Sequence, residues 1–129
     1  MILQGRFGNT SGSPYLEARV AFPRLNVRGL VSFLVDTGAD GTVLMPADSR
    51  KLGIDFRNLR NQTITEGIGG AAKGFNESAI LSFTDRRYVY SYLLKIEIAA
   101  PTTRNYRFPS LLGSLTESES RRRHTNRFR

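Results

Sequence analysis

The chain has 129 residues and a formal net charge of +8, and 40% of its residues are hydrophobic. This length predicts one domain with a core of modest size. Because the chain contains no cysteine, disulfide bonds, thiolate catalysis and cysteine-bound zinc are excluded.

Targeting segments are not expected. The N-terminal residues contain no basic segment followed by an apolar one, so we expect no signal peptide. The longest apolar stretch, Leu30 to Val35, is far too short to span a bilayer. We therefore expect a cytoplasmic protein that does not contact a membrane.

Two strands are predicted in the first third of the chain. Apolar residues recur at every second position between Leu16 and Phe22, which is the period of a half-buried strand, and Pro23 ends the run. Val27 to Val35 is a second apolar run, rich in Val and Leu and too short for a typical helix. We interpret it as a buried strand that leads directly into Asp36.

A short helix is predicted from Pro46 to Leu52. Proline stands at its first position, Asp48 lies in its first turn, and two basic residues lie in its last turn. Gly53 follows the last residue. Each of these residue types is preferred at that place in a helix.

Further short strands are predicted in the rest of the chain. They are Gln62 to Glu66, Ser78 to Phe83 and Arg87 to Ala100, followed by a short apolar element from Phe108 to Gly113. A cluster of glycines separates the first two. The apolar phase of the third shifts near Leu93–Leu94, which indicates a bulge or bend. Many short strands with one short helix predict an all-β barrel or sandwich.

The segment from Ser114 to Arg129 differs in composition from the rest. From Leu115 onward it contains five Arg and two Glu, which give +3 of the net charge, and Phe128 is the one apolar residue after Glu117. We predict a disordered, polar and basic tail. A basic chain can bind nucleic acid non-specifically, but a solvated surface is the simpler interpretation, and we do not expect a nucleic-acid partner.

One motif points to a specific chemistry. Residues 33–44 read Phe-Leu-Val-Asp-Thr-Gly-Ala-Asp-Gly-Thr-Val-Leu. This pattern resembles the active-site signature of retropepsins, the single-domain aspartic proteases, in their prokaryotic branch. Residues 65–73 resemble the glycine-rich flap that closes over a peptide in that family, and residues 108–113 resemble the apolar-apolar-Gly element beside its catalytic loop. The resemblance covers residues 3–113.

The resemblance implies a fold and a set of site residues. The fold is a small closed β-barrel of the retropepsin type with one or two short helices. Asp36 is the implied catalytic carboxylate, Thr37 braces it, and Gly38 lets the chain turn sharply. The implied substrate-binding residues are Ala39, Asp40, Gly67, Ile68, Gly69 and Gly70. No cofactor and no metal are implied.

Peptide hydrolysis without a metal or a covalent intermediate needs a base that activates water and an acid for the carbonyl. Two close carboxylates supply both by sharing one proton, and aspartic proteases are the standard example. The chain contains a single Asp-Thr-Gly, so a second Asp36 must come from an identical subunit. We therefore predict a homodimeric aspartic endopeptidase that acts on a peptide or protein substrate.

The C-terminal residues depart from the family pattern. Retropepsins usually have an Arg after the apolar-apolar-Gly element, then a short helix and a final strand in the subunit interface. Here Ser114 replaces the Arg, so it cannot pair with Asp40. We expect residues 1–113 to form the protease domain without that helix and strand, and residues 114–129 to form the tail. The alternative function is an inactive, truncated, monomeric protein of the same fold that binds peptide or nucleic acid.

Other patterns favour structural explanations. Residues 67–72 fit a dinucleotide-binding fingerprint, but that motif needs a following helix, and we predict a strand there. His124 is the single histidine, so a Ser-His-Asp triad or a metal site is not expected. Tyr88, Tyr90 and Tyr92 share one face of a strand, where core or interface packing is favoured over stacking with bases.

Overall fold

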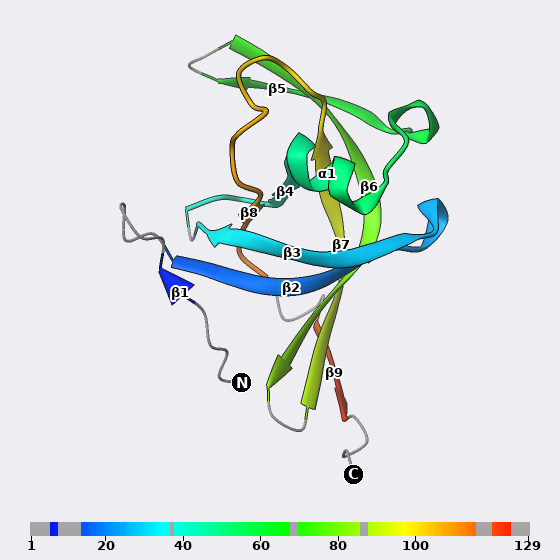
Figure 1. Cartoon of the computed structure of the whole chain (residues 1–129), viewed down its shortest axis with the longest axis vertical. Coiled ribbons are helices and arrows are strands. Elements are labelled where there is room, and N and C mark those ends of the chain that lie inside the picture. The colour runs from blue at the N-terminus through cyan, green and yellow to red at the C-terminus, as the bar shows by residue number, and fades with distance from the viewer. Residues whose placement is uncertain are drawn as a thin grey trace.

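The computed structural model describes residues 6–7, 14–36, 38–67, 70–85, 88–115 and 120–124. Strands predominate in this part of the chain (Figure 1). They are β1 (Arg6–Phe7), β2 (Pro14–Phe22), β3 (Val27–Val35), β4 (Thr42–Leu44), β5 (Gln62–Gly67), β6 (Gly70–Asp85), β7 (Tyr88–Ala99), β8 (Leu111–Leu112) and β9 (Ser120–His124). One helix, α1 (Pro46–Leu52), and two 3-10 turns, η1 (Pro23–Leu25) and η2 (Phe56–Asn58), complete the described elements.

The strands form one sheet that closes on itself. Neighbouring strands follow the order β1-β2-β3-β8-β4-β7-β6-β5, and β9 pairs with β7. A further pairing between β2 and β6 joins Arg19 to Ser82 and Ala21 to Ile80, and it closes a ring of six strands. The prediction of a small closed barrel with one or two short helices is thus confirmed.

The hydrophobic core fills the ring. On β2 the residues at every second position, Ala18, Val20 and Phe22, are buried, as are Val31 and Phe33 on β3. The other members of this buried cluster are Leu44, Ile54, Ala79, Leu81, Phe83, Leu94, Ile96, Ile98 and Leu112. Burying a large apolar side chain stabilises the fold by about 1.5–3 kcal/mol, so this cluster is the main source of stability.

The helix α1 begins and ends at the predicted residues. Pro46 occupies its first turn, and Gly53 ends it in the left-handed conformation with φ of 84°. The Gly53 N–H donates to the carbonyl oxygens of Arg50 and Ser49, which caps the last turn. Leu52 lies directly over Gly29 of β3, where a side chain would collide with it. The helix is therefore packed closely against the barrel.

The long hairpin of β6 and β7 differs from expectation in two ways. Strand β6 begins at Gly70, so the segment before Ser78 is strand as well. The pairing runs without interruption from Gly74↔Ala99 to Asp85↔Tyr88, so of the predicted bulge or bend near Leu93–Leu94 the bulge is wrong. The apparent change of phase arises because Leu93 is an apolar residue on the outer face, with 54% of its surface exposed.

Strand β9 was not expected. Its residues 120–124 pair antiparallel with Tyr88–Tyr92 of β7, so the prediction of disorder is wrong for this part of residues 114–129. Leu115 packs partly buried against the core, just before that segment. The strand escaped prediction because it contains no apolar residue, and backbone pairing along a strand edge does not require one.

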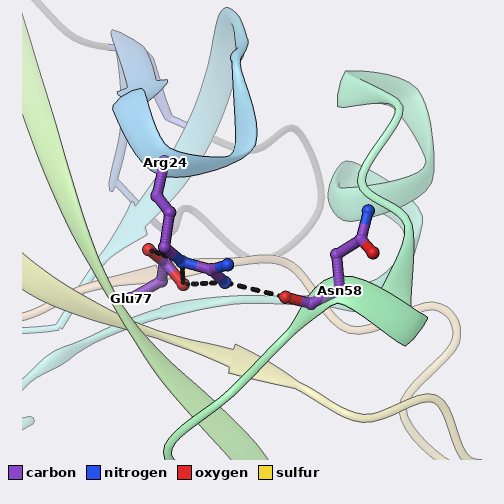
Figure 2. A network of polar contacts seen from close by, with 3 residues as sticks. All are labelled: Arg24, Asn58 and Glu77. Atoms are coloured by element: carbon purple, nitrogen blue, oxygen red, sulfur yellow. Dashed lines mark hydrogen bonds and ion pairs between the residues drawn. The ribbon is translucent and has the colours of Figure 1, made fainter.

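A polar network ties η1 to the barrel wall (Figure 2). The Arg24 guanidinium donates to both carboxylate oxygens of Glu77 on β6, at 2.7 Å from Nη2 to Oε1 and 3.0 Å from Nε to Oε2. Its Nη2 also donates to the Asn58 carbonyl oxygen at 2.8 Å. Glu77 is 5% exposed, and this bidentate pairing supplies the cation that its buried carboxylate needs.

In the described residues, no helix is long and apolar enough to cross a membrane.

Candidate active site

Asp36 stands at the end of β3, where the short strand β8 fixes its backbone. The Asp36 N–H donates to the Leu112 carbonyl oxygen at 3.0 Å, and the Leu34 N–H donates to the Ser110 carbonyl oxygen at 2.8 Å. Strand β8 runs parallel to β3 on one side and pairs with β4 at Val43 on the other. The loop of residues 36–41 therefore joins two strands that are separated by a third.

The loop turns sharply at Asp36. The Ala39 N–H donates to the Asp36 carbonyl oxygen at 3.1 Å, and the Gly38 N–H donates to the side-chain Oδ1 of Asp36, also at 3.1 Å. The first bond closes the turn, and the second holds the Asp36 carboxylate against it. The Asp36 side chain is half-buried and remains reachable from solvent, whereas Thr37 lies outside the described residues.

Gly113 packs against the backbone of this loop. A Cβ atom at Gly113 would lie 2.7 Å from the carbonyl carbon of Gly41 and 3.0 Å from its Cα. The Gly113 N–H donates to the Thr42 Oγ1 at 3.1 Å, and Thr42 is 3% exposed. Only glycine allows so close an approach, which gives a physical reason for the glycine that ends the apolar-apolar-Gly element.

The fully buried Ser110 fastens β8 from its other end. Its Oγ accepts a hydrogen bond from the Met45 N–H at 2.8 Å and donates to Asp48 Oδ2 at 2.6 Å. Asp48 belongs to the first turn of α1, and Met45 precedes that helix. The Ser110 hydroxyl thus joins β8 to α1, while the Ser110 carbonyl oxygen accepts the hydrogen bond from Leu34 of β3.

A pocket of about 240 Å³ opens beside the loop, and we call it the side pocket. It is lined by Ala39, Asp40, Gly41, Thr42, Val43, Asn76, Lys95 and Glu97. Two of the predicted substrate-binding residues, Ala39 and Asp40, therefore face a cavity. Asp40 is exposed, as is Ser114, so the missing arginine leaves no buried carboxylate without a partner.

Comparison with known proteins agrees with this geometry. A family model described as aspartyl protease matches residues 19–80, which include the whole Asp36 loop. The fold is also similar to the crystal structure of a retropepsin-like aspartic protease from Rickettsia conorii, with 24% identity and a TM-score of 0.58 over 88% of this chain and 84% of that chain. The chain has the retropepsin-like fold. The resemblance to these aspartic proteases is thus confirmed. A comparison with curated proteins gave no match.

The predicted flap of this retropepsin-like chain falls on the hairpin of β5 and β6. The two strands pair antiparallel from Gln62↔Phe75 to Gly67↔Gly70. Ile68 and Gly69 lie outside the described residues. The dinucleotide-binding interpretation is excluded, because the motif needs a helix where β6 runs as a strand.

Three residues of the retropepsin-like site escaped sequence reasoning. Ser110 and Thr42 hold the strands around Asp36, and Glu97 lines the side pocket. Serine and threonine are common in strands and beside them, and Glu97 alternates with apolar residues as any outward-facing residue does. Their roles depend on partners far along the chain. Among the described residues, no cluster of three or more His, Cys, Asp or Glu side chains could hold a metal ion.

Proposed function

We propose that the chain is one subunit of a homodimeric aspartic endopeptidase. The observation that supports this proposal is the placement of Asp36, a solvent-reachable carboxylate fixed by the Gly38 N–H and by β8 within a retropepsin-like fold. The sequence contains one Asp-Thr-Gly, so each chain contributes one carboxylate. Pairing two chains about a two-fold axis would bring two Asp36 side chains together.

In the proposed reaction the two Asp36 carboxyl groups share one proton, because two like charges so close together cannot both ionise. The ionised Asp36 removes a proton from a water molecule, which attacks the peptide carbonyl carbon. The protonated Asp36 gives its proton to the carbonyl oxygen. Collapse of the tetrahedral species breaks the C–N bond, and the nitrogen leaves with a proton from the dyad.

The peptide would bind in an extended form between the Asp36 loop and the hairpin of β5 and β6. An extended peptide can hydrogen-bond like an added strand, with its side chains in alternating pockets. Glycines at positions 67, 69 and 70 would allow the hairpin backbone to come close to the peptide. Ala39 and Asp40 would contact it from the loop. Thr37 would brace the two subunits.

A second candidate is a monomeric, inactive protein of the same fold that binds peptide or nucleic acid. Asp40 favours it, because Asp40 forms no ion pair within the described residues, whereas the family pattern supplies an arginine. Sedimentation separates the two candidates, because a chain that stays monomeric at every concentration cannot assemble two Asp36 side chains.

The decisive experiment is cleavage of a peptide library between about pH 4 and pH 7, where a shared-proton dyad can work. The wild type is compared with Asp36→Asn and with Asp55→Asn, which changes an exposed aspartate in another loop. We expect cleavage by the wild type and by Asp55→Asn, and none by Asp36→Asn. Cleavage that persists in Asp36→Asn rejects the proposal.

Mixing the subunits tests the sharing of the site. If each subunit gives one carboxylate, an excess of the Asp36→Asn chain should capture wild-type subunits in inactive mixed dimers and suppress cleavage. An excess of the Asp55→Asn chain should raise it. Equal effects of both chains would contradict a site built from two subunits.

A further inference from the structure

Glu97 occupies an unusual place in the wall of the side pocket. It lies on β7, opposite Val43 of β4 and Asn76 of β6. Its side chain extends across Gly74, where a Cβ atom would lie 2.8 Å from the Glu97 Cγ and 3.0 Å from its Cδ. Glycine within a strand often marks such a close approach. Here it makes room for the carboxyl group of Glu97.

The Glu97 carboxyl group lacks a polar partner among the described residues. Within the described part of the chain, no hydrogen bond or ion pair engages it, and its side chain is half-buried. This burial raises the pKa of Glu97 above its ordinary value of 4.5, because the charged form loses hydration. A cation that entered the pocket would restore favourable surroundings for that charge.

The other groups that line the side pocket fix its chemical preference. The charged ones are Asp40 from the loop, together with Lys95 and Glu97 from β7, so two carboxylates face one ammonium. Asn76 and Val43 face it from the neighbouring strands and are neutral. Long basic side chains combine an aliphatic stem with a charged end, and the stem can lie along Val43 while the end reaches a carboxylate.

We propose that the side pocket receives an arginine or lysine side chain of a bound peptide, and that Glu97 selects it. This inference rests on the proposed function, because the peptide would be held by the adjoining Asp36 loop. It names the substrate class, which is peptides with a basic residue at one fixed position from the cleaved bond.

The selection should depend on pH. Above its raised pKa, Glu97 is ionised and attracts the basic side chain. As the pH falls through that pKa the carboxyl group becomes neutral and the attraction is lost, while an arginine keeps its charge throughout. Because the pKa is raised by burial, the loss should begin at a higher pH than for an ordinary glutamate.

Peptide binding to the Asp36→Asn chain tests the inference without requiring cleavage. A positional library of decapeptides carries either arginine or citrulline, its neutral near-isostere, at one position at a time. At pH 7 we expect arginine to bind about three- to tenfold more tightly than citrulline at one position, as for a partly buried charged hydrogen bond. The ratio should approach one at pH 4.

Two variants in the same background provide the contrast. Glu97→Gln should abolish the arginine preference at every pH. Glu17→Gln removes an exposed glutamate on β2, outside the pocket, and should leave the preference unchanged. A preference that survives Glu97→Gln, a uniform response at all positions, or no binding of any peptide would each overturn the inference.

The outcomes separate this inference from the proposed function. Peptides that bind the Asp36→Asn chain with the arginine preference, but are never cut by the wild type, would reject proteolysis and support the pocket. Peptides that are cut by the wild type with no arginine preference would support proteolysis and reject the pocket.

Discussion

Gly113 marks the closest approach between β8 and the Asp36 loop. Its Cα lies against the backbone of Gly41, and its N–H is bonded to the buried Thr42 hydroxyl. Backbone atoms cannot move aside as the end of a flexible side chain can. Any side chain at this position must therefore push β8 away from the loop that carries Asp36.

We predict that Gly113→Ala lowers the free energy of unfolding by about 1–3 kcal/mol, as overpacking of a tight interior does. Urea unfolding followed by circular dichroism measures this change. The matched control is Gly41→Ala, because a Cβ at Gly41 would meet no atom within 4 Å. Equal stability of the two variants would show that β8 can shift freely.

For single residues, the sequence shows which side chains could take part in catalysis more readily than it shows which groups surround them in the fold. Asp36 could be singled out as a candidate because its neighbours in the chain form a recognisable pattern. Glu97 could not, because what distinguishes it is the missing side chain at Gly74, which lies on another strand. The exposure of Asp40 could not be predicted from the sequence either, since it depends on which segments pack near Asp40 in the fold.

At the scale of elements, the site depends on β8, a strand of two residues. So short a strand cannot hold itself in place by pairing alone. The Ser110 hydroxyl fixes it to Met45 and to Asp48 of α1, and so connects the helix to the strand that supports Asp36. The helix therefore contributes to the site although none of its residues lines the loop.

We expect Ser110→Ala to destabilise the protein by about 1–3 kcal/mol, because it leaves the partly buried Met45 N–H without an acceptor. Thermal or urea unfolding measures the loss. Ser114→Ala removes the hydroxyl of an exposed serine four positions later and should have little effect. If the two variants unfold alike, the Ser110 hydrogen bonds do not hold β8.

Element boundaries were predictable where local signals end an element. Proline and glycine delimit α1, and the apolar alternation of β2 ends at Pro23. The start of β6 and the whole of β9 were not predictable. Glycine is depleted in strands and a run of arginines has no apolar alternation, so neither segment shows a strand pattern, and pairing with β5 or β7 is what makes each a strand.

At the scale of the whole molecule, charge bears on assembly. Each chain has a formal net charge of +8, so the two subunits of the proposed dimer would repel each other at long range. The barrel itself could be predicted as a class from its many short strands. Its closure through β2 and β6 could not, since that pairing joins segments about sixty residues apart.

We predict that added salt strengthens the proposed dimer. Raising the ionic strength from about 0.05 to 0.5 M shortens the range of repulsion and should lower the dissociation constant several-fold. Sedimentation equilibrium at the two salt concentrations measures the change. Weaker association at high salt would indicate that opposite charges across the interface outweigh the net repulsion.

The position of β8 in the chain has a consequence for synthesis. The Asp36 N–H is bonded to Leu112, which the ribosome adds long after β3 and β4. A nascent chain that ends before residue 111 lacks both β8, which fixes the Asp36 backbone, and Gly113, which packs against the loop. Partly made chains would thus carry Asp36 without the backbone contacts that fix it, until β8 and Gly113 have been added.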